Sequence, residues 1–582
     1  MTIYQSLLAR GYFPKELPPA FFTASFANYA ATKQGRSIIS KYCPVDKFTE
    51  CVKYRLALPG VNRREFRIPH PASFSKLAIL IATHFARLLK RASSDFSRSR
   101  PVYATGRQRT LSPMVSPADL HKERAATRAG SSYLLKADVS QFYPSLYTHA
   151  VGWAIDPKLR ERTNWNNDKL LGKKLDQALM NLDGKVSQGV PIGNDISFLL
   201  AEVVLARVDN AIKSVTSQHS FRWFDDYELA FNTHEQAEEG LKKLNRELGK
   251  FRLRLNANKT AIVRLPQPSQ DEWQETLREA GTVPYMNSNK MVKYFDIAFR
   301  LREQFPDAPI LLYALGILFN INCPRYDVAQ IAQGCITQAL LCEPGAAQKA
   351  FALLSFWHVN GLTLDEALIT ATINQMIIRH EAGGFSSDCA WALAFCLEHG
   401  YTLDSKAGRV LCSFDDDCIA LQALHMEQRG LLPKGFKNKE IVKGLKDADL
   451  DREHWLIAYE TVRHDLLSVC TKAVYANPLF SEFLRHRVTF YRTRLPAYAM
   501  TLHPGGAPGW VVKSWVALLE GESERVRVQR EESLSVLPIL KLIHDDLEKT
   551  RGKHVSPDDA VASLMELFDT GADVSELGTF SG

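Results

Sequence analysis

The feature that most constrains this chain is a pair of adjacent acidic residues, Asp225 and Asp226, between two apolar, aromatic-rich runs. These runs predict two strands joined by a tight turn over residues 221–231. Such a hairpin carries both carboxylates at its tip. A carboxylate beside buried strands is costly unless it is paired or holds a metal ion. An isolated Asp-Asp pair is more often a solvent-exposed turn or a helix cap, so the assignment depends on further acids and motifs.

A third acid occurs in a matching context. Residues 131–139 predict a strand with Asp138 near its end. If this strand pairs alongside the hairpin, Asp138, Asp225 and Asp226 form a cluster of three carboxylates. Two Mg²⁺ ions roughly 3.5–4 Å apart, held by such a cluster, clamp the attacking and leaving oxygens of a phosphoryl transfer. These three aspartates are therefore the predicted catalytic and metal-binding groups.

The charge is distributed unevenly along the chain. The first 265 residues carry 41 Lys/Arg and 23 Asp/Glu, whereas the remainder carries 31 and 41. A basic half attracts polyanions, and nucleic acid or nucleoside triphosphates are the obvious partners. The alternative is a solvated basic surface that serves only solubility. Ten cysteines without a Cys-x-x-Cys pair indicate reduced thiols in an intracellular protein, not a disulfide frame or a zinc site. We expect no membrane span, because no run of 18 apolar residues occurs.

Two regions differ in their predicted secondary structure. Residues 1–265 mix strands with helices, among them helices over 73–91, 197–208 and 233–250, which indicates an α+β unit with helices packed on one sheet face. A Pro-containing linker follows at 265–270. Residues 266–582 then predict a helical-repeat domain of HEAT-like pairs, although without a clean sequence repeat an irregular bundle is the alternative.

Helix boundaries in this second region follow from capping residues. Thr363 and Glu366 form a capping-box pattern at the start of one helix. Ser387 is expected to cap the next helix, and Ser413 or Asp415 the one after it. The acidic triplet at 415–417 is therefore interpreted as part of a helix start and not as a metal site.

Two shorter motifs add to the acidic cluster. In the glycine-rich stretch 187–194, Gln188 could hydrogen-bond a nucleotide, and the glycines allow the backbone to approach a base or sugar closely. In 255–260, Lys259 follows a turn with two asparagines. Taken alone, the first motif is a turn before a helix and the second an ordinary exposed turn.

The order and spacing of these motifs resemble those of the reverse transcriptase family, over roughly residues 60–265. The first acid motif is Ala137 to His149, the Gln-Gly motif is Gln188 to Pro191, and the fourth motif runs from Leu255 to Thr260. Residues 223–226, Trp-Phe-Asp-Asp, stand where the family has Tyr-x-Asp-Asp. Trp in place of Tyr, and Gly193-Asn194 in place of the common Ser-Pro, are the two departures, and neither removes a metal ligand.

The resemblance implies a fold and a role for each motif residue. The fold is that of reverse transcriptase fingers and palm over 1–265, followed by the helical domain. Asp138 and Asp225 correspond to the main Mg²⁺ ligands, with Asp226 third, the Val139 carbonyl assisting and Mn²⁺ as an alternative ion. The other implied roles concern the nucleotide. The residues expected to bind it are Tyr143 under the sugar, Phe142, Gln188, Gly189, Lys259 near the pyrophosphate, and Arg124 and Arg128 at the triphosphate, with Arg107 and Arg109 as rivals for the last task.

Residues 142–149 and 189–194, followed by helices, look like the bacterial abortive-infection, or AbiK-like, reverse transcriptases. This resemblance implies a cytoplasmic bacterial enzyme that makes DNA from dNTPs in antiphage defence. It also implies priming by a protein hydroxyl, synthesis with or without an RNA template, and a homo-oligomer, either a trimer or a hexamer. Two alternatives remain: a templated polymerase of the retron or intron type, and a catalytically silent palm that binds nucleic acid.

One basic cluster in the helical region is predicted to bind DNA. Four arginines alternate with aromatic residues near 490, an arrangement that suits single-stranded DNA by charge and stacking: Arg485, Arg487, Arg492 and Arg494 with Phe490 and Tyr491. The alternative is a solvated amphipathic helix face.

Overall fold

The structure is a computed structural model of the 582-residue chain. It describes residues 1–494 except 61–62, 105–108, 165–166, 217–218, 283–285, 322–323, 381–385, 413–415, 434–438 and 447. Arg107, Ser413 and Asp415 therefore lie outside the described residues, as does the last part of the predicted helical domain.

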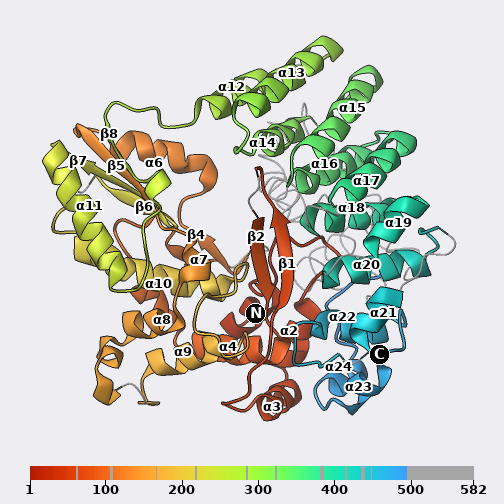
Figure 1. The fold of residues 1–582 in the computed structure, drawn as a ribbon, viewed down its shortest axis with the longest axis horizontal. Coiled ribbons are helices and arrows are strands. Elements are labelled where there is room, and N and C mark those ends of the chain that lie inside the picture. Colours follow the sequence, from red (N-terminus) through yellow and green to blue (C-terminus); the bar gives the residue numbers. More distant parts are fainter. Residues whose placement is uncertain are drawn as a thin grey trace, which may run out of the picture.

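A four-stranded antiparallel sheet forms the centre of the α+β region. Its order is β6 (Phe221–Trp223), β7 (Asp226–Phe231), β5 (Tyr133–Asp138) and β8 (Ala261–Arg264). The predicted hairpin is therefore present, and the predicted strand that contains Asp138 pairs directly with its second strand. The sheet lies on one side of the molecule, away from the later helices (Figure 1).

Two long helices cover one face of this sheet. α10 (Asp195–Ile212) is buried along almost its whole length, and α11 (His234–Gly249) turns Ala237, Leu244 and Leu248 inward. They pack on the sheet face that holds Leu135 and Leu229. Thr233 and Gln236 form a capping box at the start of α11, so the predicted helix over 233–250 is confirmed.

The N-terminal part consists of short helices and two hairpins. The helices up to the sheet are α1 (Ile3–Ala9), α2 (Ala24–Ala31), α3 (Lys33–Tyr42), α4 (Pro71–Thr83), α5 (Phe85–Arg91) and α6 (Leu120–Thr127). The hairpins are β1 (Val52–Ala57) with β2 (Arg63–Ile68), and β3 (Pro101–Tyr103) with β4 (Leu111–Pro113). Between β5 and α10 lie α7 (Phe142–Ser145), α8 (Thr148–Ile155) and α9 (Leu171–Met180).

The helix predicted over 73–91 is two helices that meet at a 79° bend. The break at His84 lets α4 pack on α1, α3 and α9 while α5 packs on α10. One straight helix could not reach both sets of partners. No other helix or helix pair in the described residues is long and apolar enough to cross a membrane; α4 with α5 meets that test by length and composition only, and α4 is largely buried.

All described regular structure after residue 265 is helical. The helices are α12 (Glu272–Gly281), α13 (Ser288–Gln304), α14 (Ile310–Ile317), α15 (Tyr326–Cys342), α16 (Ala347–Val359), α17 (Glu366–His380), α18 (Ser386–His399), α19 (Ser405–Leu411), α20 (Asp417–Gln428), α21 (Lys439–Leu445), α22 (Trp455–Arg463), α23 (Thr471–Ala476) and α24 (Phe480–Arg485). Helices two apart stack on each other: α13, α15, α17 and α19 form one row, and α12 to α22 in even numbers form the other. We call α12–α22 the helical array. Two stacked rows are the arrangement of repeat proteins; the HEAT-like assignment stays a prediction.

Two predicted caps in the array are wrong. The predicted helix start at the acidic triplet is confirmed, with Asp416 as the N-cap where Ser413 or Asp415 was expected. α17 begins at Glu366, and Asp365, not Thr363, accepts the Leu368 amide. Ser387 lies inside α18, where its hydroxyl accepts the backbone amide of Ala57. The start of α20 is capped by Asp416, within the acidic triplet, which accepts two amides of the first turn.

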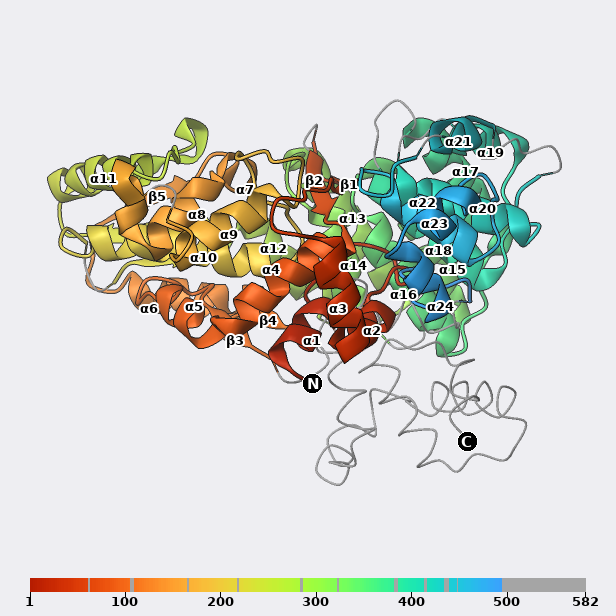
Figure 2. The same cartoon turned by 90° about the horizontal axis from the view of Figure 1, so that it is seen from below.

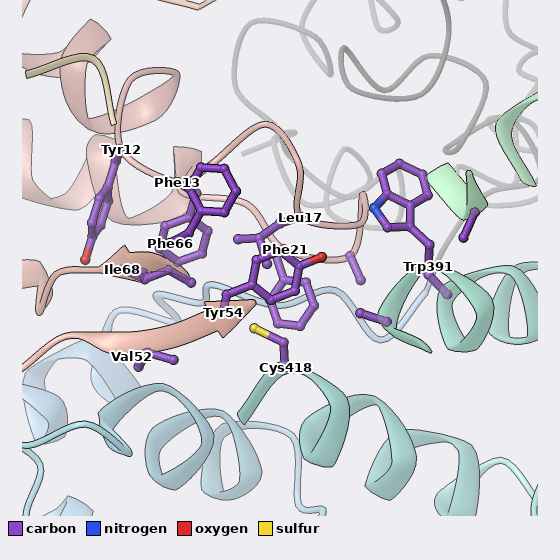
Figure 3. Close-up of a cluster of buried hydrophobic side chains, with 14 of the residues drawn as sticks. Tyr12, Phe13, Leu17, Phe21, Val52, Tyr54, Phe66, Ile68, Trp391 and Cys418 are labelled. Carbon is purple, nitrogen blue, oxygen red and sulfur yellow. The ribbon is translucent and has the colours of Figure 1, made fainter. Parts of the chain in front are cut away.

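The β1–β2 hairpin and the N-terminal segment pack against the array. Tyr54 of β1 lies in a buried cluster with Trp391 of α18 and Cys418 of α20 (Figure 3). The Trp391 indole donates to the Glu16 carbonyl (2.9 Å). Figure 2 shows α1–α3 beside the last described helices, and the rings of Phe26 and Phe483 are 5.7 Å apart there. The two regions of the chain therefore share one hydrophobic core.

Candidate active site

The three predicted aspartates lie together at one end of the sheet. Asp138 is the last residue of β5 and Asp226 the first of β7, and the two are direct cross-strand partners. Asp225 occupies the two-residue turn between β6 and β7 with Phe224. Directly opposed residues in an antiparallel pair point to the same face, so the Asp138 and Asp226 side chains share one face of the sheet.

Hydrogen bonds from neighbouring residues hold the backbone of this turn. Phe224 has φ of 52°, which is unfavourable for a residue with a Cβ. Its amide donates to the Ser99 hydroxyl (2.7 Å) and its carbonyl accepts from Arg222 (2.5 Å). The amide of Val139, itself buried, donates to the Asp225 carbonyl (3.2 Å). These contacts fix the path of the chain through Asp225.

The aspartates repel one another. Burial raises the pKa of Asp225, and the nearby Asp138 adds to the rise. Burial, Asp225 and Asp138 raise the pKa of Asp226 to about 7. Lys259 partly offsets this charge, because its Nζ donates to Asp138 Oδ2 (3.0 Å), and this hydrogen bond raises the Lys259 pKa. Closely spaced carboxylate oxygens with excess negative charge are the donor set that hard divalent cations prefer.

The three side chains are neighbours, but they do not form a coordination sphere in this structure. Within the part of the chain that the structure describes, no group of three or more His, Cys, Asp or Glu side chains is arranged so that it could hold an ion. Lys259 takes up one oxygen of Asp138. The fit to a divalent cation is therefore one of ligand chemistry and charge, and not of side-chain geometry in this structure.

The Gln-Gly motif lies against the first acid motif. The Gly189 amide donates to the Leu146 carbonyl (3.0 Å) and the Val190 amide to the Tyr143 carbonyl (3.1 Å). Gly189 has φ of 88°, and a Cβ there would lie 3.2 Å from the Pro144 carbonyl oxygen, so only glycine suits this contact. Gln188 is exposed beside it. The structure thus brings Gln188, Gly189 and Tyr143 together.

Tyr143 and Phe142 occupy different environments. Tyr143 is half-buried and lies in electrostatic reach of Asp225, since burial, Glu202 and Asp225 together raise its pKa. Phe142 is a core residue with 4% of its surface exposed, and its ring centre is 5.2 Å from that of Tyr143. The expectation that Phe142 lines the nucleotide is therefore wrong: burial removes its ring from the surface, and the ring packs against that of Tyr143.

The arginines expected at the triphosphate have other partners. Arg124 of α6 and Arg128, the C-cap of that helix, both pair with Glu228 of β7, at 2.6 and 2.7 Å. Both also donate to carbonyls of the linker after β8. The rival Arg109 pairs with Asp195 (2.6 Å) and donates to the Gly193 carbonyl (2.9 Å). These contacts give all three a structural task that sequence spacing did not reveal.

Sequence reasoning missed Arg64. This exposed residue of β2 faces the same side of the hairpin as Phe66, whose ring approaches Gly193 beside the Gln-Gly motif. Its positive charge lowers the pKa values of both Asp225 and Tyr143, which places it near the site. The one available signal was its position among the many basic residues before residue 100.

The predicted DNA-binding cluster near 490 is not a stacking surface. Phe490 and Tyr491 are fully buried in the core that joins the two regions. Arg485 pairs with Glu482 (2.5 Å), and the Arg492 guanidinium lies over the Phe22 ring (4.4 Å). Arg487 and Arg494 are exposed. The aromatic side chains expected to stack on bases serve the core instead.

Comparison with known proteins adds a family for part of the chain. Residues 75–294 match the family model described as reverse transcriptase (RNA-dependent DNA polymerase). Comparison with curated proteins found no match. Similar solved structures include apo telomerase from Candida tropicalis, with 12% identity, coverage of 65% of this chain and 70% of that chain, and a TM-score of 0.30. Another is telomerase from Candida albicans in complex with the TWJ fragment of telomeric RNA, with 13% identity, coverage of 74% and 70%, and a TM-score of 0.27.

These TM-scores are too low to inform the architecture of this chain. The family match, by contrast, spans the whole sheet with its three aspartates, the Tyr143–Gln188 neighbourhood and Lys259. Residues 75–294 are therefore a reverse transcriptase domain, and the chain is a nucleotidyltransferase of the RNA-directed DNA polymerase class.

Proposed function

We propose that this chain polymerises deoxynucleoside triphosphates at the tip of the β6–β7 hairpin. The observation that carries the proposal is the cross-strand pairing of Asp138 with Asp226, with Asp225 in the adjoining turn. Three carboxylates gathered from two strands, with the pKa of Asp226 raised to about 7, are poised to accept positive charge.

Asp138 and Asp225 would hold the divalent cations, Mg²⁺ or Mn²⁺, with Asp226 as third ligand and the Val139 carbonyl assisting. Cations bound there would stabilise the charge that develops on the transferred phosphoryl group. Lys259, already bonded to Asp138, would face the departing pyrophosphate.

The remaining residues would position the nucleotide. Tyr143 would lie beneath the deoxyribose, where its ring excludes a 2′-hydroxyl, and Gln188 and Gly189 would border the base and sugar. Arg64 would contact the triphosphate. A hydroxyl oxygen attacks the α-phosphorus, the new P–O bond forms, and the bond to the β-phosphate bridging oxygen breaks to release pyrophosphate. The attacking hydroxyl is the 3′-hydroxyl of the growing strand or, at initiation, a protein hydroxyl.

The biological setting that we propose is bacterial antiphage defence, with protein-primed synthesis that needs no added template, by a cytoplasmic homo-oligomer. The support is the resemblance of residues 142–149 and 189–194 to abortive-infection enzymes, together with a helical region after the sheet.

The first experiment tests the site. Purified protein with Asp225→Ala and Asp226→Ala is expected to lose incorporation of labelled dNTPs and to keep its circular dichroism spectrum. Asp327→Ala, at an exposed acid of α15, is the matched control and should retain activity. Incorporation by the double variant at the wild-type rate would exclude these carboxylates as the site.

The second experiment tests the template and the primer. Nuclease-treated protein is incubated with dNTPs with and without RNA, and the products are run on gels before and after protease digestion. Product that forms without RNA and shifts after digestion supports template-free, protein-primed synthesis. Product that depends on RNA and does not shift supports the templated alternative. Binding of dNTP without incorporation would indicate a silent palm.

A further inference from the structure

A fully buried ion cluster lies directly behind the acidic hairpin. Arg222 of β6 has no exposed surface, and both of its carboxylate partners, Glu202 and Asp209 of α10, are also buried. Arg222 donates to Glu202 at 2.9 and 3.0 Å and to Asp209 at 2.9 to 3.2 Å. Replacing such a cluster by apolar residues is often neutral or stabilising, so stability alone does not account for it.

The cluster is bonded to the residue that precedes Asp225. Arg222 donates from its guanidinium to the Phe224 carbonyl (2.5 Å). The Phe224 amide donates to Ser99, whose hydroxyl donates in turn to Glu202 (2.9 Å). Both backbone polar groups of Phe224 are thus held from the same side, at a residue with φ of 52°. A non-glycine residue keeps such a conformation only where its surroundings impose it.

A neighbouring serine offers a natural comparison. Ser97 is as deeply buried as Ser99, at 1% and 0% exposure, and its hydroxyl donates to the other oxygen of Glu202 (2.8 Å). The hydroxyls of Ser97 and Ser99 are 3.3 Å apart. Only Ser99 also accepts the Phe224 amide. The two side chains therefore share burial, chemistry and the Glu202 partner, and differ in the contact that Ser99 alone makes with Phe224. The backbone of Ser97 bridges to Arg222, a contact that replacing its side chain leaves in place.

We propose that Ser99 and Arg222 are positioning residues that clamp Phe224 and so set the aim of the Asp225 carboxylate. The inference rests on the proposed function, because the task of the clamp is to hold Asp225 where it serves nucleotidyl transfer. Asp225 follows Phe224 directly, so rotation about the Phe224 backbone swings its carboxylate relative to Asp138. The amide of Val139 on the Asp225 carbonyl supports the same path from the β5 side.

The test compares Ser99→Ala with Ser97→Ala in the full-length protein. Three quantities are measured: the turnover number and KM for dNTP, the affinity for Mn²⁺ without nucleotide by electron paramagnetic resonance, and the melting temperature. Ser97→Ala loses its bond to Glu202, whereas Ser99→Ala loses its bond to Glu202 and the acceptor of the Phe224 amide. Both variants should therefore keep a cooperative melting transition at a lowered temperature, and Ser99→Ala should melt at the lower one. Ser99→Ala should in addition lose roughly tenfold or more in turnover, because small misplacements of catalytic groups have effects of this size.

The KM for dNTP should stay near the wild-type value in both variants, since neither serine borders the nucleotide. Mn²⁺ should bind more weakly to Ser99→Ala than to Ser97→Ala. Equal turnover and equal Mn²⁺ affinity in the two variants would overturn the inference. If the wild type incorporates no dNTP, although Asp225→Ala with Asp226→Ala weakens its Mn²⁺ binding, the proposed function fails while the metal site stands. The Mn²⁺ comparison between the serine variants then still decides whether the clamp exists.

Discussion

Arg64 is the cation whose position makes it the expected triphosphate contact. Arg64 lies on the β1–β2 hairpin, and its charge acts on both Asp225 and Tyr143. Hydrogen bonds to charged groups contribute about 1.5–3 kcal/mol, so Arg64→Ala should raise the KM for dNTP roughly tenfold or more and change turnover less. Steady-state kinetics measure both. Arg55→Ala is the matched control, because Arg55 lies on the opposite face of the same hairpin; an equal rise in KM for this variant would contradict the assignment.

Tyr143 is expected to decide between deoxyribonucleotides and ribonucleotides. Its half-buried side chain packs against the Phe142 ring, and its backbone carbonyl accepts the Val190 amide. Tyr143→Ala removes the bulk that would meet a 2′-hydroxyl, and the preference for dGTP over GTP in kcat/KM should fall by roughly 10- to 200-fold. Tyr143→Phe keeps the ring and should keep the preference. Unchanged discrimination in the alanine variant would show that another residue sets the sugar specificity.

For single residues, the sequence predicted the positions of those that belong to a motif, because the motif determines which residues lie beside them. The three aspartates lie together because β5 pairs with β7 so that Asp138 is opposite Asp226, and Asp225 precedes Asp226 in the turn. Arg124 and Arg128 could not be assigned in the same way. Their partner Glu228 lies on β7, about 100 positions later in the chain. A local sequence pattern does not predict an ion pair between segments so far apart. Basic residues in a basic region are individually indistinguishable until their partners are known.

Asp388, at the start of α18, gives the helical array a predicted dependence on pH. It is fully buried, and its carboxylate accepts the Gly345 amide (2.9 Å). Burial raises its pKa from 3.8 to about 7, which corresponds to up to about 4 kcal/mol. The folded state holds this proton more tightly than the unfolded chain does. The contribution of the protonated carboxyl to the free energy of unfolding is therefore complete below about pH 4 and is lost as the pH rises to about 7.

Asp388→Asn should therefore gain melting temperature relative to the wild type at pH 7.5 and not at pH 4.5, because the amide stays neutral at both. Asp388→Ala removes the acceptor of the Gly345 amide and should melt lower at both pH values. Melting followed by circular dichroism at the two pH values checks this. A constant offset between Asp388→Asn and the wild type would show that the carboxyl is ionised throughout.

Elements with a strong local signal were predicted, and those decided by distant partners were not. The helix over 233–250 begins at a capping box and follows its own apolar periodicity. The bend at His84 depends on α10 as partner of α5. Ser387 has the chemistry of a cap, yet its hydroxyl takes the Ala57 amide from the β1–β2 hairpin, a contact that no local reading of α18 contains.

The predicted domain boundary at residue 265 does not coincide with a break in the hydrophobic core, which continues across it. The reverse transcriptase match begins at residue 75 and runs to 294, into α12 and α13. The segment before it also packs on the C-terminal part of the chain: β1 with Tyr54 on α18 and α20, and Phe13 and Phe26 on Phe490 and Phe483. Sequence showed the change of composition at 265, but the packing of the first 70 residues on segments more than 300 residues later depends on the tertiary fold.

This shared core predicts that residues 1–265 do not fold alone. Without residues 266–582, the buried faces of Tyr54 and Phe26 would be open to water, and exposed apolar patches of this kind favour aggregation. Expressed alone, 1–265 should be aggregated or lack a cooperative melting transition, as judged by gel filtration and circular dichroism. Co-expression with 266–582 restores the partners Trp391 and Phe483 and should give a soluble complex that incorporates dNTPs. A monodisperse, cooperatively melting 1–265 fragment would show instead that the reverse transcriptase half has a sufficient core of its own, and that the array is an appended module.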